Sequence, residues 1–187
     1  MWPSGMAVLD VPLSGKLGAG ELAELGRALG RLTDVGWGNR LRELFGPGAP
    51  VDGPVPDDMV EGCVAVLASW GWEQRPVGVV AMGSVTRPKL VSSLAERIST
   101  IGRLPLLGEI GVRGVGERQA NSARRLAQVW RSLEVGPDLA DRLSTVDGPV
   151  LLVDDRVDTG WTITLAAKRV RDAGAPAVLP FALATTS

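Results

Sequence analysis

Apolar and polar positions follow two different rhythms along the last two-thirds of the chain. Short runs dominated by valine, leucine and isoleucine are separated by longer stretches in which apolar residues recur every three or four positions. The first pattern is typical of strands buried on both faces, and the second of amphipathic helices. Strands are therefore predicted over 76–82, 104–110, 148–155 and 177–184, and helices over 57–72, 88–102, 120–135, 138–146 and 161–174.

This order of elements favours an α/β fold, because strands that alternate with helices form a parallel sheet covered on both faces. The first 56 residues are less regular. Leucine spacing predicts a helix over 20–32, and a second short helix is expected over 37–45. A short edge hairpin over 6–17, which contains Pro12, and a glycine- and proline-rich loop over 46–56 complete this part. The chain is thus divided into an N-terminal helical or irregular appendage, residues 1–56, and an α/β core, residues 57–187.

Two residue types that serve many enzymes are scarce. The chain of 187 residues contains no histidine and a single cysteine, Cys63. These absences exclude Ser-His-Asp and Cys-His catalysis, histidine-bearing metal sites, an internal disulfide and a thiolate zinc cage. The GxGxxA pattern at 18–23 does not follow a buried strand, as a dinucleotide fingerprint would. We expect no zinc, haem or nicotinamide cofactor.

Charge and hydropathy limit the kinds of partner that we expect for this chain. No apolar run approaches the roughly 20 residues that span a bilayer, and the N-terminus lacks a basic region followed by an apolar stretch. We therefore expect a cytoplasmic protein that does not enter a membrane. The formal net charge is −1, but residues 75–131 carry +7 between ends of −5 and −3. A basic middle segment suggests an anionic partner on one face, although a solvated arginine-rich surface gives the same pattern.

The candidate chemistry lies in residues 150–162, V-L-L-V-D-D-R-V-D-T-G-W-T. An apolar strand delivers two acids to its carboxyl end, where α/β sheets bind ligands. A glycine turn then opens a helix, so free amides, a helix dipole and two hydroxyls surround one point suited to a phosphate. The acids can accept hydrogen bonds from sugar hydroxyls or hold a hydrated Mg²⁺. The segment predicts a ribose 5-phosphate site, and the alternative is an Asp-rich turn that caps an ordinary helix.

The same segment resembles the phosphoribosyl pyrophosphate (PRPP) motif of type I phosphoribosyltransferases: four apolar residues, two acids, three residues, then T-G-x-T. The resemblance implies a type I phosphoribosyltransferase-like core with Mg²⁺ at Asp154 and Asp155. Asp158 stands where purine-salvage members carry a carboxylate proposed as general base. The residues that would bind the ribose phosphate are Asp154, Asp155, Asp158, Thr159, Gly160, Trp161 and Thr162.

Three features depart from the family pattern. Arg156 follows the two acids at a position that is usually apolar, and Trp161 stands where small residues or lysine are commoner. The last predicted strand is followed by no further segment, so we expect the N-terminal appendage to close the site. In this family the loop after the first core strand binds pyrophosphate, which implies residues 83–89 with Arg87 and Lys89 as diphosphate contacts.

A second resemblance covers nearly the whole chain. The opening MWPSGM, segment 34–45, the run 86–108, the helix start NSARRL at 121–126 and the ending 175–185 are similar to the C-terminal region of actinobacterial RecQ-like DNA helicases, in the same order. The resemblance implies an accessory domain of a DNA-repair protein, with DNA and the helicase motor domains as partners. The chain itself lacks the GxxxxGK[ST] phosphate loop of an ATPase.

Three functions stay open from these patterns. In the first, which we favour, the chain is a phosphoribosyltransferase-fold accessory domain of a RecQ-like helicase that assists nucleic-acid binding or domain organisation. In the second it is an active Mg²⁺-dependent phosphoribosyltransferase that uses PRPP. In the third it senses a ribose phosphate or nucleotide without turnover. The nucleic-acid phosphate contacts in the first reading are Arg87, Lys89, Arg118, Arg124 and Arg125.

Overall fold

The helices and strands follow the predicted order, with two additional short strands. In the computed structural model the described residues are 25–113 and 122–186. The strands are β1 (Arg27–Arg31), β2 (Gly78–Met82), β3 (Leu106–Val112), β4 (Leu133–Glu134), β5 (Val150–Val157) and β6 (Val178–Thr185). The helices are α1 (Gly38–Phe45), α2 (Asp57–Ala68), α3 (Pro88–Gly102), α4 (Ser122–Ser132), α5 (Pro137–Leu143) and α6 (Trp161–Asp172).

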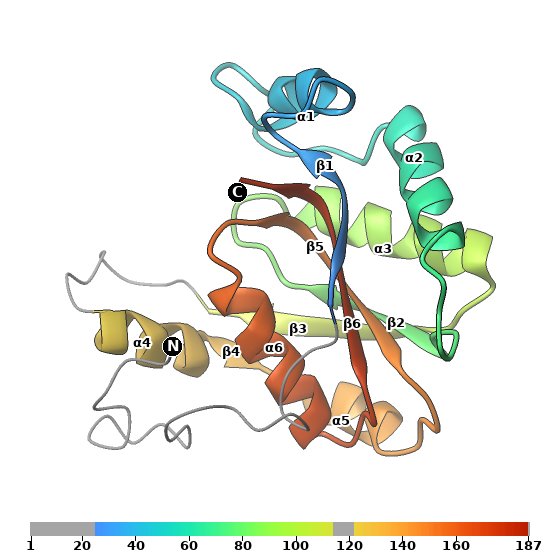
Figure 1. Cartoon of the computed structure of the whole chain (residues 1–187). Coiled ribbons are helices and arrows are strands. Elements are labelled where there is room, and N and C mark those ends of the chain that lie inside the picture. Colours follow the sequence, from blue (N-terminus) through green and yellow to red (C-terminus); the bar gives the residue numbers. More distant parts are fainter. Residues whose placement is uncertain (1–24, 114–121, 187) are drawn as a thin grey trace.

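The strands of the described residues form one sheet in the order β1-β6-β5-β2-β3-β4. Neighbouring strands run parallel, except that β4 pairs antiparallel with β3 at the edge. Helices α2 and α3 lie on one side of the sheet, and α4 and α6 lie on the other (Figure 1). The prediction of an α/β fold built on a parallel sheet is confirmed. None of the helices in the described ranges is long and apolar enough to cross a bilayer.

The central strands supply the core. All five residues of β2 are buried, and the four apolar residues Val150–Val153 of β5 are no more than 1% exposed. Because helices cover both faces, side chains that point either way from these strands leave water. Each such aliphatic side chain contributes about 1.5–3 kcal/mol relative to an exposed position, so β5 is held firmly in the middle of the sheet.

The predicted helix over 20–32 is wrong where the structure describes it, because Arg27–Arg31 forms strand β1. The strand runs parallel to β6, with Arg27 opposite Phe181 and Arg31 opposite Thr185. Without β1, one side of β6 would present unpaired N–H and C=O groups at a sheet edge. Long-range pairing therefore outweighs the helical spacing of the leucines. The hairpin predicted over 6–17 lies outside the described residues.

The N-terminal part bends over the carboxyl edge of the sheet after β1. Helix α1 lies beyond the end of β1 (Figure 1), and the predicted loop over 46–56 leads back to α2. Within that loop, the Asp52 carboxylate accepts the backbone N–H groups of Lys89 at 3.0 Å and Leu90 at 3.1 Å. These amides belong to the first turn of α3, which has no intrahelical acceptor for them. Asp52 thus caps α3 and ties the loop to the core.

Asp52→Ala is expected to lower the free energy of unfolding, because it leaves the amides of Lys89 and Leu90 without their acceptor. Urea unfolding followed by circular dichroism measures the loss. Asp52→Asn retains one acceptor oxygen and should lose less. The exposed Asp147→Ala serves as the matched control and should stay within about 0.5 kcal/mol of the parent chain; equal losses at positions 52 and 147 would contradict the capping role.

Candidate functional site

The two acids of the 150–162 segment lie inside the motif strand. Strand β5 continues to Val157, two residues beyond the predicted end, and Asp154 pairs in register with Ala182 of β6. Asp154 is only 9% exposed, whereas Asp155 is half-buried. The acid pair (Asp154 and Asp155) lies in the second half of β5, and the neighbouring strands β2 and β6 run parallel to β5. The pair is therefore near the carboxyl edge of the sheet, where ligands of α/β folds bind.

A tight bend joins the acid pair to helix α6. Gly160 adopts a left-handed conformation with φ of 76° and directly precedes the first helical residue, Trp161. Only glycine adopts this conformation without strain. The first intrahelical bond runs from the Thr164 N–H to the Gly160 carbonyl at 3.0 Å, and the N-cap residue Gly160 itself has no side chain that could cap the helix. The bend therefore offers the start of a helix to an anion.

The hydroxyl and carboxyl groups of the bend differ in their surroundings. Thr159 and Thr162 are exposed, and Trp161 is half-buried against the core. Asp158 Oδ1 accepts the Thr186 hydroxyl at 2.5 Å, and the Thr186 N–H donates to the Val157 carbonyl at 3.1 Å. The end of β6 therefore fixes the bend from one side and leaves the threonine hydroxyls open to a ligand.

Burial dominates the electrostatics of the acid pair. It raises the pKa of Asp154 to about 7, and the charge of Asp155 acts in the same direction. The Asp155 N–H donates to Asp154 Oδ1 at 2.8 Å, which partly offsets this effect. Burial also raises the pKa of Asp155, while the charges of Arg156 and Arg87 oppose the increase. The pair thus holds a proton closer to neutral pH than two exposed aspartates would.

The loop after β2 starts beside the acid pair, because residues 78–81 of β2 lie in register with residues 150–153 of β5. The Arg87 Nη1 donates to the Leu44 carbonyl at 2.7 Å, and the charge of Arg87 acts on Asp155. Lys89 is exposed, but its backbone N–H is already bonded to Asp52. The structure therefore brings Arg87 toward the acid pair, whereas the amides at the start of α3 are occupied by the protein's own carboxylate.

Phe45 is a site residue that the sequence analysis missed. The guanidinium carbon of Arg87 lies 5.0 Å from the centre of its ring, and that of Arg156 lies 5.7 Å away. Arg156 stood out in the sequence only as a departure from a motif. No local sequence pattern predicts this contact, because the three residues come from α1, the loop after β2 and strand β5. We call Arg87, Phe45 and Arg156 the Arg–Phe–Arg cluster.

The remaining predicted phosphate contacts stay predictions. Arg118 and the side chains of Arg124 and Arg125 lie outside the described part of the structure. The backbone of positions 124 and 125 belongs to the first half of α4, which packs against α6.

A metal site was predicted at the acid pair. The described residues contain no group of three or more histidine, cysteine, aspartate or glutamate side chains placed to hold a metal ion. Mg²⁺ is commonly bound by one or two protein carboxylates together with waters and substrate phosphates. Asp154 and Asp155 therefore fit a Mg²⁺ that arrives with a phosphate ligand, and not a cage made by the protein alone.

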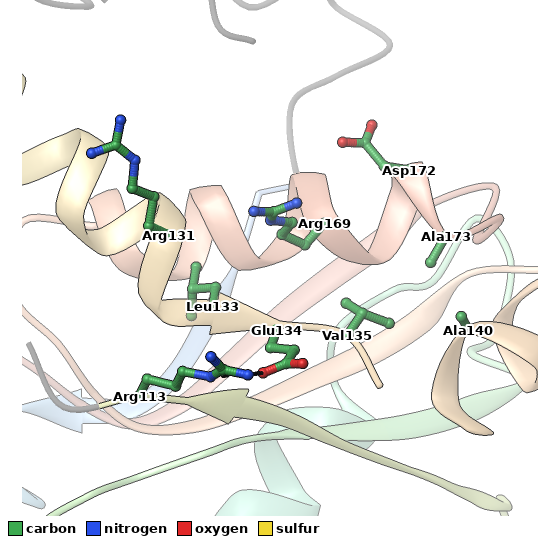
Figure 2. Close-up of a pocket in the computed structure, with 9 residues that line it drawn as sticks. All are labelled: Arg113, Arg131, Leu133, Glu134, Val135, Ala140, Arg169, Asp172 and Ala173. Carbon is green, nitrogen blue, oxygen red and sulfur yellow. Dashed lines mark hydrogen bonds and ion pairs between the residues drawn. The ribbon is translucent and has the colours of Figure 1, made fainter. Parts of the chain in front are cut away.

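A polar cavity of about 500 Å³ lies elsewhere, between β4, α5 and α6 (Figure 2). Arg113 pairs with Glu134 at 2.7 Å, and Arg169 stacks on the Trp130 ring at 3.7 Å and donates to the Trp130 carbonyl at 3.1 Å. The buried Nε of Arg169 has no hydrogen-bond partner in the described part of the structure. Neither the acid pair nor the bend lines this cavity. It is therefore a feature separate from the candidate site.

The buried acid predicts a pH-dependent stability. Because the pKa of Asp154 rises from 3.8 to about 7 on folding, the unfolded chain releases this proton at lower pH. The contribution of Asp154 to the free energy of unfolding is thus full below about pH 4 and falls as the pH rises toward 7. Between pH 5 and pH 8 the free energy of unfolding of the parent chain should fall by about 2–4 kcal/mol more than that of Asp154→Asn. Urea unfolding at the two pH values measures this difference. Equal pH slopes for the two proteins, with Asp147→Asn as the control, would refute this assignment.

Comparisons with known proteins give limited similarity. No protein-family model and no curated protein matches the sequence. Among solved structures, the chain is similar to a purine phosphoribosyltransferase from Pyrococcus horikoshii Ot3, with 15% sequence identity and a TM-score of 0.42. The match covers 73% of this chain and 89% of that one.

Proposed function

We propose that the chain is a phosphoribosyltransferase-like domain that binds a phosphoribosyl ligand, PRPP or a nucleotide, at the carboxyl end of β5. The observation that carries the proposal is the acid pair in β5 followed by a glycine bend that opens helix α6. Carboxylates accept hydrogen bonds from vicinal hydroxyls, and a helix start with nearby threonine hydroxyls suits a phosphate. A ribose 5-phosphate carries both groups.

Each end of such a ligand has its own set of residues. Asp154 and Asp155 would accept the ribose hydroxyls, and the amides and hydroxyls of 159–162 would hold the 5-phosphate. Arg87 stands on the neighbouring strand's loop and supplies a cation for a diphosphate, whereas the Lys89 amide is engaged by Asp52. A Mg²⁺ bound with the ligand at the acid pair would supply further positive charge to the diphosphate.

Transfer of the ribose to a base is the more demanding version of this function. It requires a base acceptor and a group that takes its proton, the role proposed for Asp158 by the motif resemblance. Asp158 is exposed and bonded to the Thr186 hydroxyl, which leaves its second carboxylate oxygen for a further contact. Release of pyrophosphate from PRPP in the presence of a panel of nucleobases distinguishes an enzyme from a binding module.

Binding should be measurable without turnover. Isothermal calorimetry with PRPP and Mg²⁺ is expected to give saturable binding, and Asp155→Asn should weaken it about 10- to 100-fold, the effect of losing a hydrogen bond to a charged group. Gly160→Ala should weaken it as well, because alanine is strained at this φ. Asp147 lies before the start of β5, at the opposite edge of the sheet, so Asp147→Asn should bind PRPP as tightly as the parent chain. Absence of PRPP binding by the parent chain would reject the proposal.

A second function is proposed for the whole chain: an accessory domain of a RecQ-like DNA helicase that contacts nucleic acid. The observation that favours it is the charge of +7 over residues 75–131 in a chain of net −1, together with the long sequence strings that resemble such helicases. Phosphate contacts from arginine and lysine would supply the affinity. Arg87, Lys89, Arg118, Arg124 and Arg125 are the residues proposed for this role.

DNA binding of this kind depends steeply on salt. The chain should bind a short DNA duplex at low salt, and the logarithm of its affinity should fall with the logarithm of salt concentration, by about 0.9 for each phosphate contact. The double variant Arg124→Gln/Arg125→Gln should reduce this slope by the amount that corresponds to about two phosphate contacts. Arg97→Gln removes a charge that is already paired with Asp57 and should leave the slope nearly unchanged. No binding at low salt would eliminate this function.

A further inference from the structure

The Arg–Phe–Arg cluster joins three parts of the chain at the mouth of the site. Phe45 is the last residue of α1, Arg87 ends the loop after β2, and Arg156 lies in the last part of β5. Strands β2 and β5 are parallel neighbours, so their carboxyl ends bring the two arginines to one edge. Both guanidinium groups lie over the same aromatic ring, at 5.0 Å and 5.7 Å from its centre.

The ring offsets an unfavourable arrangement. Two guanidinium groups of like charge repel each other, and an aromatic face attracts each of them through its quadrupole. Within the described residues neither Arg87 nor Arg156 forms an ion pair with a carboxylate. Within the described residues the Arg87 guanidinium donates one hydrogen bond, from Nη1 to the Leu44 carbonyl. Phe45 is therefore the neighbour that the two cations share.

A cation stacked on a ring keeps its hydrogen-bond donors. The N–H groups of a guanidinium lie in its plane, so a contact made through its flat face leaves them available. Two such groups side by side present forked donors that match the oxygens of phosphate groups. The two arginines lie at the edge where β2 and β5 end, which also carries the acid pair, and their charges oppose the increase that burial causes in the pKa of Asp155.

We propose that Phe45 is a positioning residue that holds Arg87 and Arg156 side by side as a paired binding site for a phosphate-bearing anion next to the acid pair. This inference deepens the proposed function and rests on it for the identity of the natural ligand, whereas the pairing itself is tested with a simple anion. Phe45 touches no ligand in this arrangement and acts only through the two arginines.

Inorganic pyrophosphate, titrated into the full chain by calorimetry at low salt, is the probe. Phe45→Leu keeps an apolar side chain but removes the aromatic face, and should weaken binding about five- to tenfold. Phe45→Tyr keeps the aromatic face and should bind within about twofold of the parent chain. A merely structural role would not separate leucine from tyrosine in this way.

Charge variants test the pair without touching α1. Arg156→Gln, at an exposed position, should weaken pyrophosphate binding at least about fivefold, and this result keeps the inference testable if Phe45→Leu does not fold. Arg97→Gln removes one positive charge on α3, where the arginine is paired with Asp57, and should have less than about a twofold effect. Unchanged binding in Phe45→Leu and Arg156→Gln, or no pyrophosphate binding by the parent chain, overturns the inference.

The same titrations separate this inference from the proposed function. A parent chain that binds pyrophosphate but not PRPP, with the expected loss in Phe45→Leu, upholds the paired arginine site and rejects the phosphoribosyl ligand. A parent chain that binds PRPP with unchanged affinity in Phe45→Leu upholds the ligand and rejects the role of Phe45. Tighter binding in Phe45→Leu also rejects it, because the ring would then compete with the anion for the arginines.

Discussion

The structure depends on the burial of β5 between two parallel neighbours and two layers of helices. Its backbone groups pair with β2 on one side and β6 on the other, and its apolar residues 150–153 are removed from water on both faces. This constraint carries Asp154 into the sheet, where water is excluded and the ionised carboxylate is destabilised. It also fixes the direction in which the chain leaves the sheet, so that the acid pair and the bend before α6 meet at one edge.

The N-terminal part is joined to that edge by three different interactions. Strand β1 extends the sheet beside β6, Asp52 caps α3, and two arginines from the core contact the ring of Phe45. Because two of these interactions involve the segment 87–90, the conformation of the loop after β2 is tied to the position of α1. The candidate site is thus bounded by the core on one side and by α1 on the other.

Sequence reasoning was most successful where the hydrophobic pattern is strong. The helix predicted over 88–102 has the bounds of α3, with Pro88 at its first turn, and the motif strand was displaced by only two residues at either end. It failed at 20–32, where a helical spacing of leucines hides a strand. It also did not find β4, a two-residue strand, because so short a segment carries no periodicity of its own.

The sequence by itself determined the strand, bend and helix around Asp154 and Asp155, because the apolar run, the glycine and the start of the helix are all encoded within residues 150–162. Only the tertiary structure decided which groups surround that segment. Pairing of β1 with β6, capping of α3 by Asp52 and convergence of Arg87 and Arg156 on Phe45 join residues far apart along the chain. Such contacts arise from the packing of distant elements, and no local pattern encodes them.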